Sequence, residues 1–119
     1  MTGLDPHYRG DTFDYDFTLG NGWVMADFTG GLVFTLRSSI PADGTTVDTD
    51  AVDQASVATG EITGSGTAGN VLIPATRVTL WPKGRLHWDL QGKVSGSPAR
   101  VYTIDSGVIL IRHDITRTQ

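Results

Sequence analysis

The amino-acid sequence predicts an all-β protein, an immunoglobulin-like antiparallel β-sandwich of about seven strands with one short helical turn near residues 75–81. Apolar residues recur at every second position in several segments, and no segment shows a sustained apolar period of 3.6 residues. Turn-forming residues recur at intervals of roughly 8 to 12 residues, as they do in sandwiches. No internal repeat or linker divides the 119 residues, so we expect a single domain over residues 1–119.

The first half of the chain contains the two clearest strand patterns. Residues 12–19 alternate bulky apolar side chains with Asp and Thr, and residues 32–37 place Leu and Phe at alternate positions. Asn21-Gly22 tolerates positive φ, which predicts a turn followed by a short returning strand at 23–25. Residues 41–50 are rich in Pro, Gly, Asp and Thr and predict an exposed loop.

The second half predicts further strands around the helical turn. A weak strand signal at 54–62 and a stronger one at 70–73 flank a glycine-rich break. Pro74 suits the start of a helical turn over 75–80, which Pro82-Lys83-Gly84 ends.

The last part of the chain predicts a strand at 85–91 and a terminal hairpin. The hairpin strands, 100–105 and 108–113, are joined by a tight turn at Asp105-Ser106-Gly107. The inward positions of the predicted strands define the expected core, and Trp81 is expected to close one end of the sandwich. The core residues on the strands are Phe17, Phe34, Trp88 and Leu90.

The charge of the chain is unevenly distributed. Nine basic and 13 acidic residues give a net charge of −4. Residues 1–60 carry nine Asp and two Arg, a net −7, whereas residues 61–119 carry four acidic and seven basic residues, a net +3. This distribution does not suit a nucleic-acid binder, which would cluster its positive charge. Either copies of the chain pack by charge complementarity, or strands of the two halves interleave and the asymmetry disappears in space.

The absence of cysteine and of targeting segments limits the class of protein further. Without cysteine, zinc fingers, disulfide scaffolds and thiol nucleophiles are excluded, and a reducing compartment is expected. The N-terminus resembles no signal peptide, and the longest strongly apolar run, Val108–Ile111, is too short to span a bilayer. We therefore expect synthesis in the cytoplasm without secretion, no membrane association and no cofactor.

Several short motifs suggest chemistry, but their context favours structural roles. Residues 64–69 match G-x-G-x-x-G, yet no buried strand precedes them and no long helix can follow them, so we interpret them as a hairpin loop. Residues 48–53 resemble the start of a calcium loop, but Val52, Asp53 and Thr59 stand where an EF-hand needs an oxygen ligand, Gly and Glu, which leaves only a weak, nonstandard cation site as an alternative. Asp14 and Asp16 lie about 6.6 Å apart along one strand face, a spacing compatible with glycoside hydrolysis. Solvent-facing carboxylates explain them better.

The histidines offer no complete site in the sequence. His87 shares a strand face with Asp89, but no Gly-x-Ser-x-Gly segment supplies a serine nucleophile. His7, His87 and His113 lie in three separate segments. We interpret them as surface residues.

Two groups of residues are predicted to contact partners or to shape the first strand. The predicted interface residues are the loop acids and one tryptophan beside a turn: Asp43, Asp48, Asp50, Asp53 and Trp23. Arg9-Gly10-Asp11 spells an adhesion tripeptide. With Thr12 it leads directly into the first strand, so we interpret Arg9, Gly10, Asp11 and Thr12 as a strand-entrance motif in which Asp11 or Thr12 bonds nearby backbone.

Six short segments, in order, carry a resemblance to a known group of proteins. These segments are Arg9–Phe13, Asp27–Gly31, Phe34–Arg37, Leu80–Gly84, Trp88–Gln91 and His113–Arg117. Together they resemble the small immunoglobulin-like domains of tailed bacteriophages, similar to the N-terminal domain family of phage upper baseplate proteins. Residues 41–54 match no part of that pattern, and no downstream helix or fibre follows.

The resemblance implies a non-enzymatic structural protein of the phage virion. Capsid decoration, the head–tail region and a baseplate accessory role are the expected locations, with other virion proteins as partners and several copies per particle. The alternative from the residues themselves is a carbohydrate-binding module for host surface glycans, which would need an exposed aromatic platform that includes Trp23. A small hydrolase built on Asp14 and Asp16 ranks behind both.

Overall fold

The computed structural model describes residues 2–3, 7–8, 11–20, 22–38, 51–96 and 99–112. The predicted loop at 41–50, with Asp43, Asp48 and Asp50, therefore lies outside the described residues. The same is true of Arg9, Gly10 and His113.

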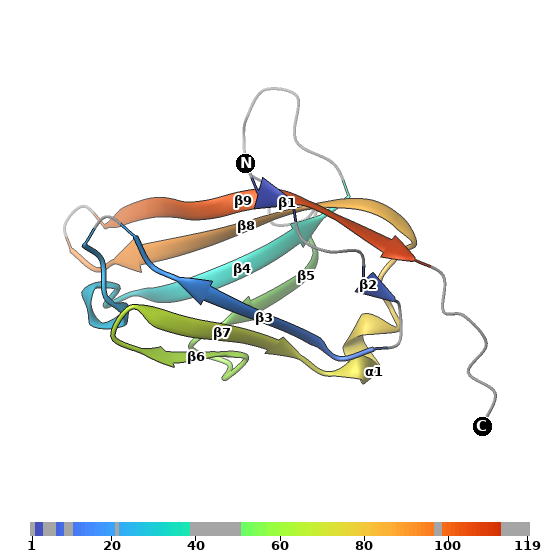
Figure 1. The fold of residues 1–119 in the computed structure, drawn as a ribbon. Coiled ribbons are helices and arrows are strands. Elements are labelled where there is room, and N and C mark those ends of the chain that lie inside the picture. Colours follow the sequence, from blue (N-terminus) through green and yellow to red (C-terminus); the bar gives the residue numbers. More distant parts are fainter. Residues whose placement is uncertain are drawn as a thin grey trace.

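Two sheets face each other in a sandwich (Figure 1). The six-stranded sheet has the order β1 (Thr2–Gly3), β9 (Arg100–Arg112), β8 (Gly84–Val94), β4 (Gly31–Arg37) and β5 (Ala51–Ser56), with β2 (His7–Tyr8) also paired to β9. The three-stranded sheet has the order β3 (Phe13–Thr18), β7 (Ala68–Ile73) and β6 (Ile62–Ser65). The predicted all-β sandwich is confirmed.

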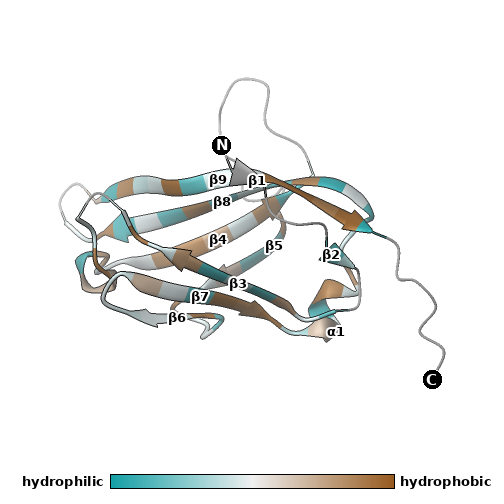
Figure 2. Ribbon diagram, in the orientation of Figure 1, coloured by the Kyte–Doolittle hydropathy of each residue, from teal (hydrophilic) through white to brown (hydrophobic). Residues whose placement is uncertain are grey.

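Alternation of side chains explains the small sheet. Phe13 and Phe17 of β3 are buried, whereas Asp14 and Asp16 between them are exposed. Figure 2 shows the same alternation of hydrophobic and hydrophilic residues along β3. Residues 64–69 form the end of the β6–β7 hairpin, in which Gly66 has a φ of 59°, so the hairpin interpretation of the glycine-rich motif is confirmed.

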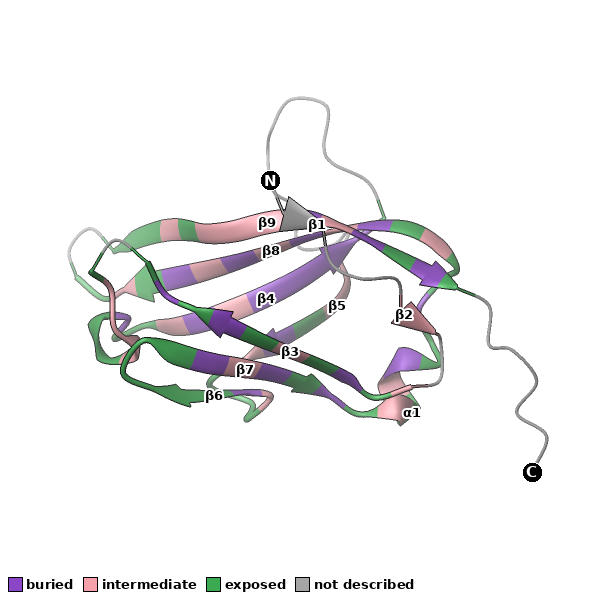
Figure 3. Ribbon diagram, in the orientation of Figure 1, coloured by how far each residue is buried: buried purple, intermediate pink, exposed green. Residues whose placement is uncertain are grey.

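Aromatic side chains from both sheets fill the core. Trp88 is stacked on Phe34, with ring centroids 5.7 Å apart, and meets Tyr15 edge-on at 5.5 Å. Phe17 and Leu90 are buried in the same cluster, as predicted, and Figure 3 shows the buried residues along β4 and β8. The inward phase of these strands follows from their sequence.

The short helix α1 (Ala75–Val78) begins directly after Pro74, which confirms the predicted helical turn. Trp81 follows it and is 1% exposed. The prediction that Trp81 closes one end of the core is confirmed. The weak strand signal at 54–62 corresponds to parts of β5 and β6, which are separated by a turn that ends at Gly60, with a φ of 91°.

The predicted terminal hairpin is wrong. Asp105-Ser106-Gly107 lies inside the single long strand β9, which runs antiparallel to β8 over its whole length. A register shift opposite Leu90 and Gln91 accommodates the irregularity, because Ile104 is the extra residue of a bulge. The Asp105 side chain accepts a hydrogen bond from the Ser106 amide at 2.8 Å. The turn-forming residues therefore stabilise a bulge inside the strand instead of a hairpin turn.

The predicted short strand at 23–25 is also wrong. Residues Met25–Asp27 form a 3-10 turn, η1. The Asp27 carboxylate accepts a hydrogen bond from the Val24 amide at 2.9 Å, and the Asp27 amide donates to the Val24 carbonyl at 3.0 Å. These local bonds favour a turn over an extended chain.

Candidate functional site

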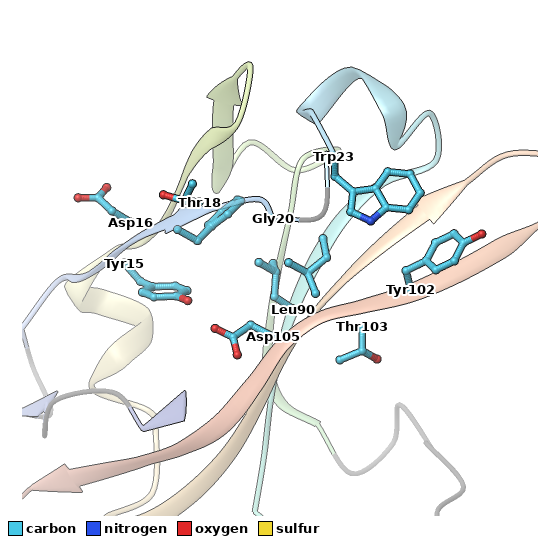
Figure 4. A pocket seen from close by; sticks show the side chains of 11 residues that line it. Tyr15, Asp16, Thr18, Gly20, Trp23, Leu90, Tyr102, Thr103 and Asp105 are labelled. Atoms are coloured by element: carbon cyan, nitrogen blue, oxygen red, sulfur yellow. The ribbon is translucent and has the colours of Figure 1, made fainter. Parts of the chain in front are cut away.

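An aromatic cleft lies on one side of the sandwich, where β3 ends and β9 begins. Two adjoining cavities form it, with volumes of about 350 and 520 Å³. Trp23 and Tyr102 line both cavities. Figure 4 shows these two rings at one end of the first cavity and Tyr15 and Asp105 at the other. We call this region the Trp23–Tyr102 cleft.

The aromatic rings of the cleft are held in place by contacts with each other and with Phe28. The centroids of Trp23 and Tyr102 lie 5.1 Å apart with their planes at 45°, and Phe28 lies 4.9 Å from Trp23. Phe28 in turn covers Gly92, the register partner of Tyr102, where an added Cβ would approach the phenyl ring to 2.4 Å. Glycine at this position lets the three rings form one supported group.

Tyr15 and Asp105 form the deep polar end of the first cavity. Burial, the charge of Asp105 and a hydrogen bond to its carboxylate raise the pKa of Tyr15 to about 12. The Tyr15 phenol therefore stays protonated at neutral pH and holds the Asp105 carboxylate in place. The Tyr15 phenol therefore supports the cleft and is not poised to release its proton near pH 7.

The second cavity contains groups of opposite charge. Asp27, Ser95 and Arg100 line it beside the two shared rings. One oxygen of Asp27 accepts the Val24 amide, and the Ser95 amide donates to the Thr29 hydroxyl at 2.9 Å. These bonds fix the backbone around the cavity, while Arg100 remains exposed. The cleft thus combines aromatic faces with hydrogen-bond donors and acceptors.

Of the predicted interface residues, Trp23 lies in this cleft and Asp53 does not. Asp53 points to the end of the core, where it accepts hydrogen bonds from Trp81 Nε1 at 2.9 Å and from Arg77 Nη2 at 2.6 Å. Both carboxylate oxygens are therefore used inside the fold. The structure gives the Asp53 carboxylate an internal role, in which it is bonded to two elements of the fold.

Arg77 joins Asp53 to Glu61. The hydrogen bond and charge of Asp53 raise the pKa of Arg77 above its ordinary value, with a further contribution from Glu61. Burial alone would raise the pKa of Glu61, but hydrogen bonds from Thr59, the Ser56 amide and Arg77 hold it below its ordinary value. This cluster fastens β5 and the segment before β6 to α1.

The strand-entrance motif is described from Asp11 onward. The Asp11 amide donates to the Tyr8 carbonyl at 3.1 Å, and the Asp11 carbonyl accepts a hydrogen bond from His7 Nε2 at 3.0 Å. Burial lowers the pKa of His7, which also contacts Phe13 edge-on at 5.4 Å. His7 is therefore a structural residue and not the surface histidine that the sequence suggested.

The paired acids of β3, Asp14 and Asp16, have matching surroundings. Asp14 and Asp16 are exposed on the outer face of the small sheet, and both accept hydrogen bonds from the side-chain amide of Asn70. Both carboxylates thus meet the same environment, whereas glycoside hydrolysis needs an acid and a base in different ones. His87 and Asp89 lie on the large sheet, where Asp89 is paired with Arg37 at 3.3 Å.

Tyr102 and Arg100 line the cleft, although neither is predicted as a site residue from the sequence. The two residues occupy alternate positions of one predicted strand, so their side chains are expected on the same face of that strand. The cleft itself exists only because β9 lies beside the end of β3 and η1. Within the described ranges, no group of three or more His, Asp or Glu residues could hold a metal ion. No helix in the described part of the chain has the length and apolarity to cross a membrane.

Comparison with known proteins adds no family to this description. No protein-family model matches the sequence, and a search of curated proteins finds no significant match.

Proposed function

We propose that this chain is a non-enzymatic structural protein of a bacteriophage virion that docks, in several copies, onto its own neighbours and other virion subunits. The ordered short segments that resemble phage immunoglobulin-like domains support the virion assignment. The observation that carries the docking function is the separation of charge between the two outer faces of the sandwich. Each face also exposes aliphatic side chains.

The outer face of the small sheet is acidic with an apolar centre. Asp14 is paired in register with Leu72, and opposite residues of antiparallel strands share a face. Leu72 is 48% exposed, and Asp16 lies two residues from Asp14 on the same face. This acidic face thus offers an apolar contact surrounded by carboxylates.

The outer face of the large sheet is basic. Arg85 is paired with Leu110, and Lys93 is paired with Val101. All four side chains are exposed, Val101 by 53%. The strands of the two halves of the chain do interleave, yet the two outer faces differ in charge, with Asp14 and Asp16 on one face and Arg85 and Lys93 on the other.

Opposite charges on opposite faces suit contact between unlike surfaces. The acidic face of one copy can meet the basic face of the next, with Leu72 against Val101 or Leu110. Such a head-to-tail contact generates a ring or an extended array rather than an isolated symmetric pair. Multiple copies on a particle are the natural use of this geometry.

Charge exchange tests this proposal. Sedimentation velocity should show association that weakens as salt rises above about 0.15 M, where the Debye length is near 8 Å. Asp14→Lys/Asp16→Lys and Arg85→Glu/Lys93→Glu should each reduce self-association, and an equimolar mixture of the two variants should restore it. Lys83→Glu, in the turn before β8, is the matched control and should behave like the wild type.

A mixture that does not restore association would contradict the face-to-face contact, provided that both variants melt like the wild type. A protein that stays monomeric at 0.05 M salt and millimolar concentration would contradict multi-copy docking between its own copies.

The second candidate function is a carbohydrate-binding module. The Trp23–Tyr102 cleft favours it, because half-exposed aromatic rings beside polar groups are the usual platform for sugar rings. A virion protein can also perform this function at a host surface.

A further inference from the structure

We propose that the Trp23–Tyr102 cleft binds the pyranose rings of neutral polysaccharides and discriminates against acidic ones. This inference rests on the carbohydrate-binding candidate and names its site and ligand class. Three features carry it: the supported aromatic rings, the polar groups beside them and the charge of the lining.

The rings offer apolar surface at low entropic cost. Trp23 packs against Phe28 and Tyr102, with centroid distances of 4.9 and 5.1 Å. A ring that is already held by its neighbours loses little freedom when a ligand stacks on it. The C–H groups of a pyranose ring match such a surface, since sugars have one weakly polar face.

The polar groups beside the rings can bind hydroxyls. Asp27 and Ser95 supply oxygen acceptors in the larger cavity, and Arg100 supplies donors. Sugar hydroxyls both donate and accept, so a wall with both kinds of group satisfies them.

The division of the cleft into two cavities indicates a chain of sugars rather than a single residue. Trp23 and Tyr102 border both hollows, with volumes of about 350 and 520 Å³. A chain that passes over the shared rings would place successive sugars in the two hollows. Each volume lies in the range of roughly 300–1,000 Å³ that small-ligand sites occupy.

The charge of the lining determines the class of glycan. The carboxylates of Asp27 and Asp105 border the two cavities, and Arg100 is the single basic residue among the described lining residues. The excess of carboxylates repels uronates, sialic acids and phosphorylated sugars. Neutral hexose or N-acetylhexosamine chains encounter no such repulsion.

Intrinsic tryptophan fluorescence tests the site directly. The chain has three tryptophans, and Trp81 and Trp88 are 1% and 2% exposed, so a ligand in the cleft changes the emission of Trp23. The probes are neutral hexasaccharides of glucose, galactose and N-acetylglucosamine, compared with hexasaccharides of hyaluronan and polygalacturonate. We expect saturable binding of at least one neutral probe, at least tenfold tighter than either acidic probe.

Variants locate the binding. Tyr102→Ala should weaken the neutral probe at least tenfold, and Trp23→Phe, which keeps a ring against Phe28, should abolish the fluorescence change while calorimetry still detects binding. Leu80→Ala is the matched control, because Leu80 is 81% exposed and lies outside the cleft. It should bind like the wild type.

The outcomes separate the site from the function. Equal or tighter binding of an acidic probe, or unchanged binding by Tyr102→Ala, would overturn the assignment of neutral glycans to this cleft while leaving carbohydrate binding intact. No binding of any probe would overturn both. Loss of self-association in Tyr102→Ala without any glycan binding would identify the cleft as a protein contact and would also overturn the proposal.

Discussion

Replacing Trp88 with alanine is expected to lower the free energy of unfolding by about 3–5 kcal/mol, the range typical of large-to-small changes at buried aromatic positions. Trp88 is buried between the sheets, stacked on Phe34 and edge-on to Tyr15. Its removal leaves a cavity at the point where the two layers meet. Urea unfolding followed by circular dichroism measures the effect.

Trp88→Phe is the matched control. Trp88 Nε1 has no hydrogen-bond partner in the described structure, so its loss removes a buried polar group together with part of the ring. We expect this variant to lose much less stability than the alanine variant. An alanine variant that unfolds at the wild-type urea concentration would show that β8 presents its other face to the core.

Replacing Asp53 with alanine is expected to cost about 2 kcal/mol, because three donors, Trp81 Nε1, Arg77 Nη2 and the Gln54 amide, lose their acceptor at once. Trp81 Nε1 loses its partner, and Arg77 retains Glu61 and the Gln54 carbonyl. The Arg77 side chain is 32% exposed, so water offsets part of the loss and the full cost of a buried broken pair does not apply. Thermal or urea unfolding measures the change.

Asp53→Asn should fall between the wild type and alanine, since its amide oxygen still accepts one hydrogen bond. Asp14→Ala, which removes an exposed carboxylate of the same length, should change stability by less than about 0.5 kcal/mol. Equal stability of Asp53→Ala and Asp14→Ala would contradict the internal role of Asp53 and would indicate that its side chain is exposed to solvent.

The strand phases and the core could be predicted from the sequence because they depend on local alternation. Phe17 and Trp88 occupy inward positions whichever strands become neighbours, and Trp81 follows a helical turn that Pro74 begins. The alternation of side chains on a strand is a property of the backbone itself. Those predictions therefore needed no knowledge of topology.

The predictions that failed depended on contacts distant in sequence. Asp105-Ser106-Gly107 has the composition of a turn, but pairing with β8 keeps it extended and uses its small residues beside Trp88. The internal partners of Asp53, Arg77 and Trp81, also come from another part of the chain, and the composition of the loop does not reveal them. A composition rule cannot distinguish an exposed carboxylate from one whose partners come from another element.

Only one residue of the candidate site, Trp23, could be predicted from the sequence as a site residue. Trp23 beside a turn suggested an aromatic platform, whereas Tyr102 looked like an ordinary strand residue. The cleft arises because Gly92 leaves room for Phe28, which supports Trp23, and because β9 places Tyr102 alongside. Such a site depends on the arrangement of two sheets and has no linear signature.

The most direct test of the virion assignment is the composition of purified phage particles from the genome that encodes this chain. Quantitative mass spectrometry of particles banded in a density gradient should find the chain in multiple copies relative to the major capsid protein. Density for a two-layered sandwich should then be visible on the particle by electron cryomicroscopy. Particles that lack the chain, with all of it recovered as free protein in the lysate, would contradict the account.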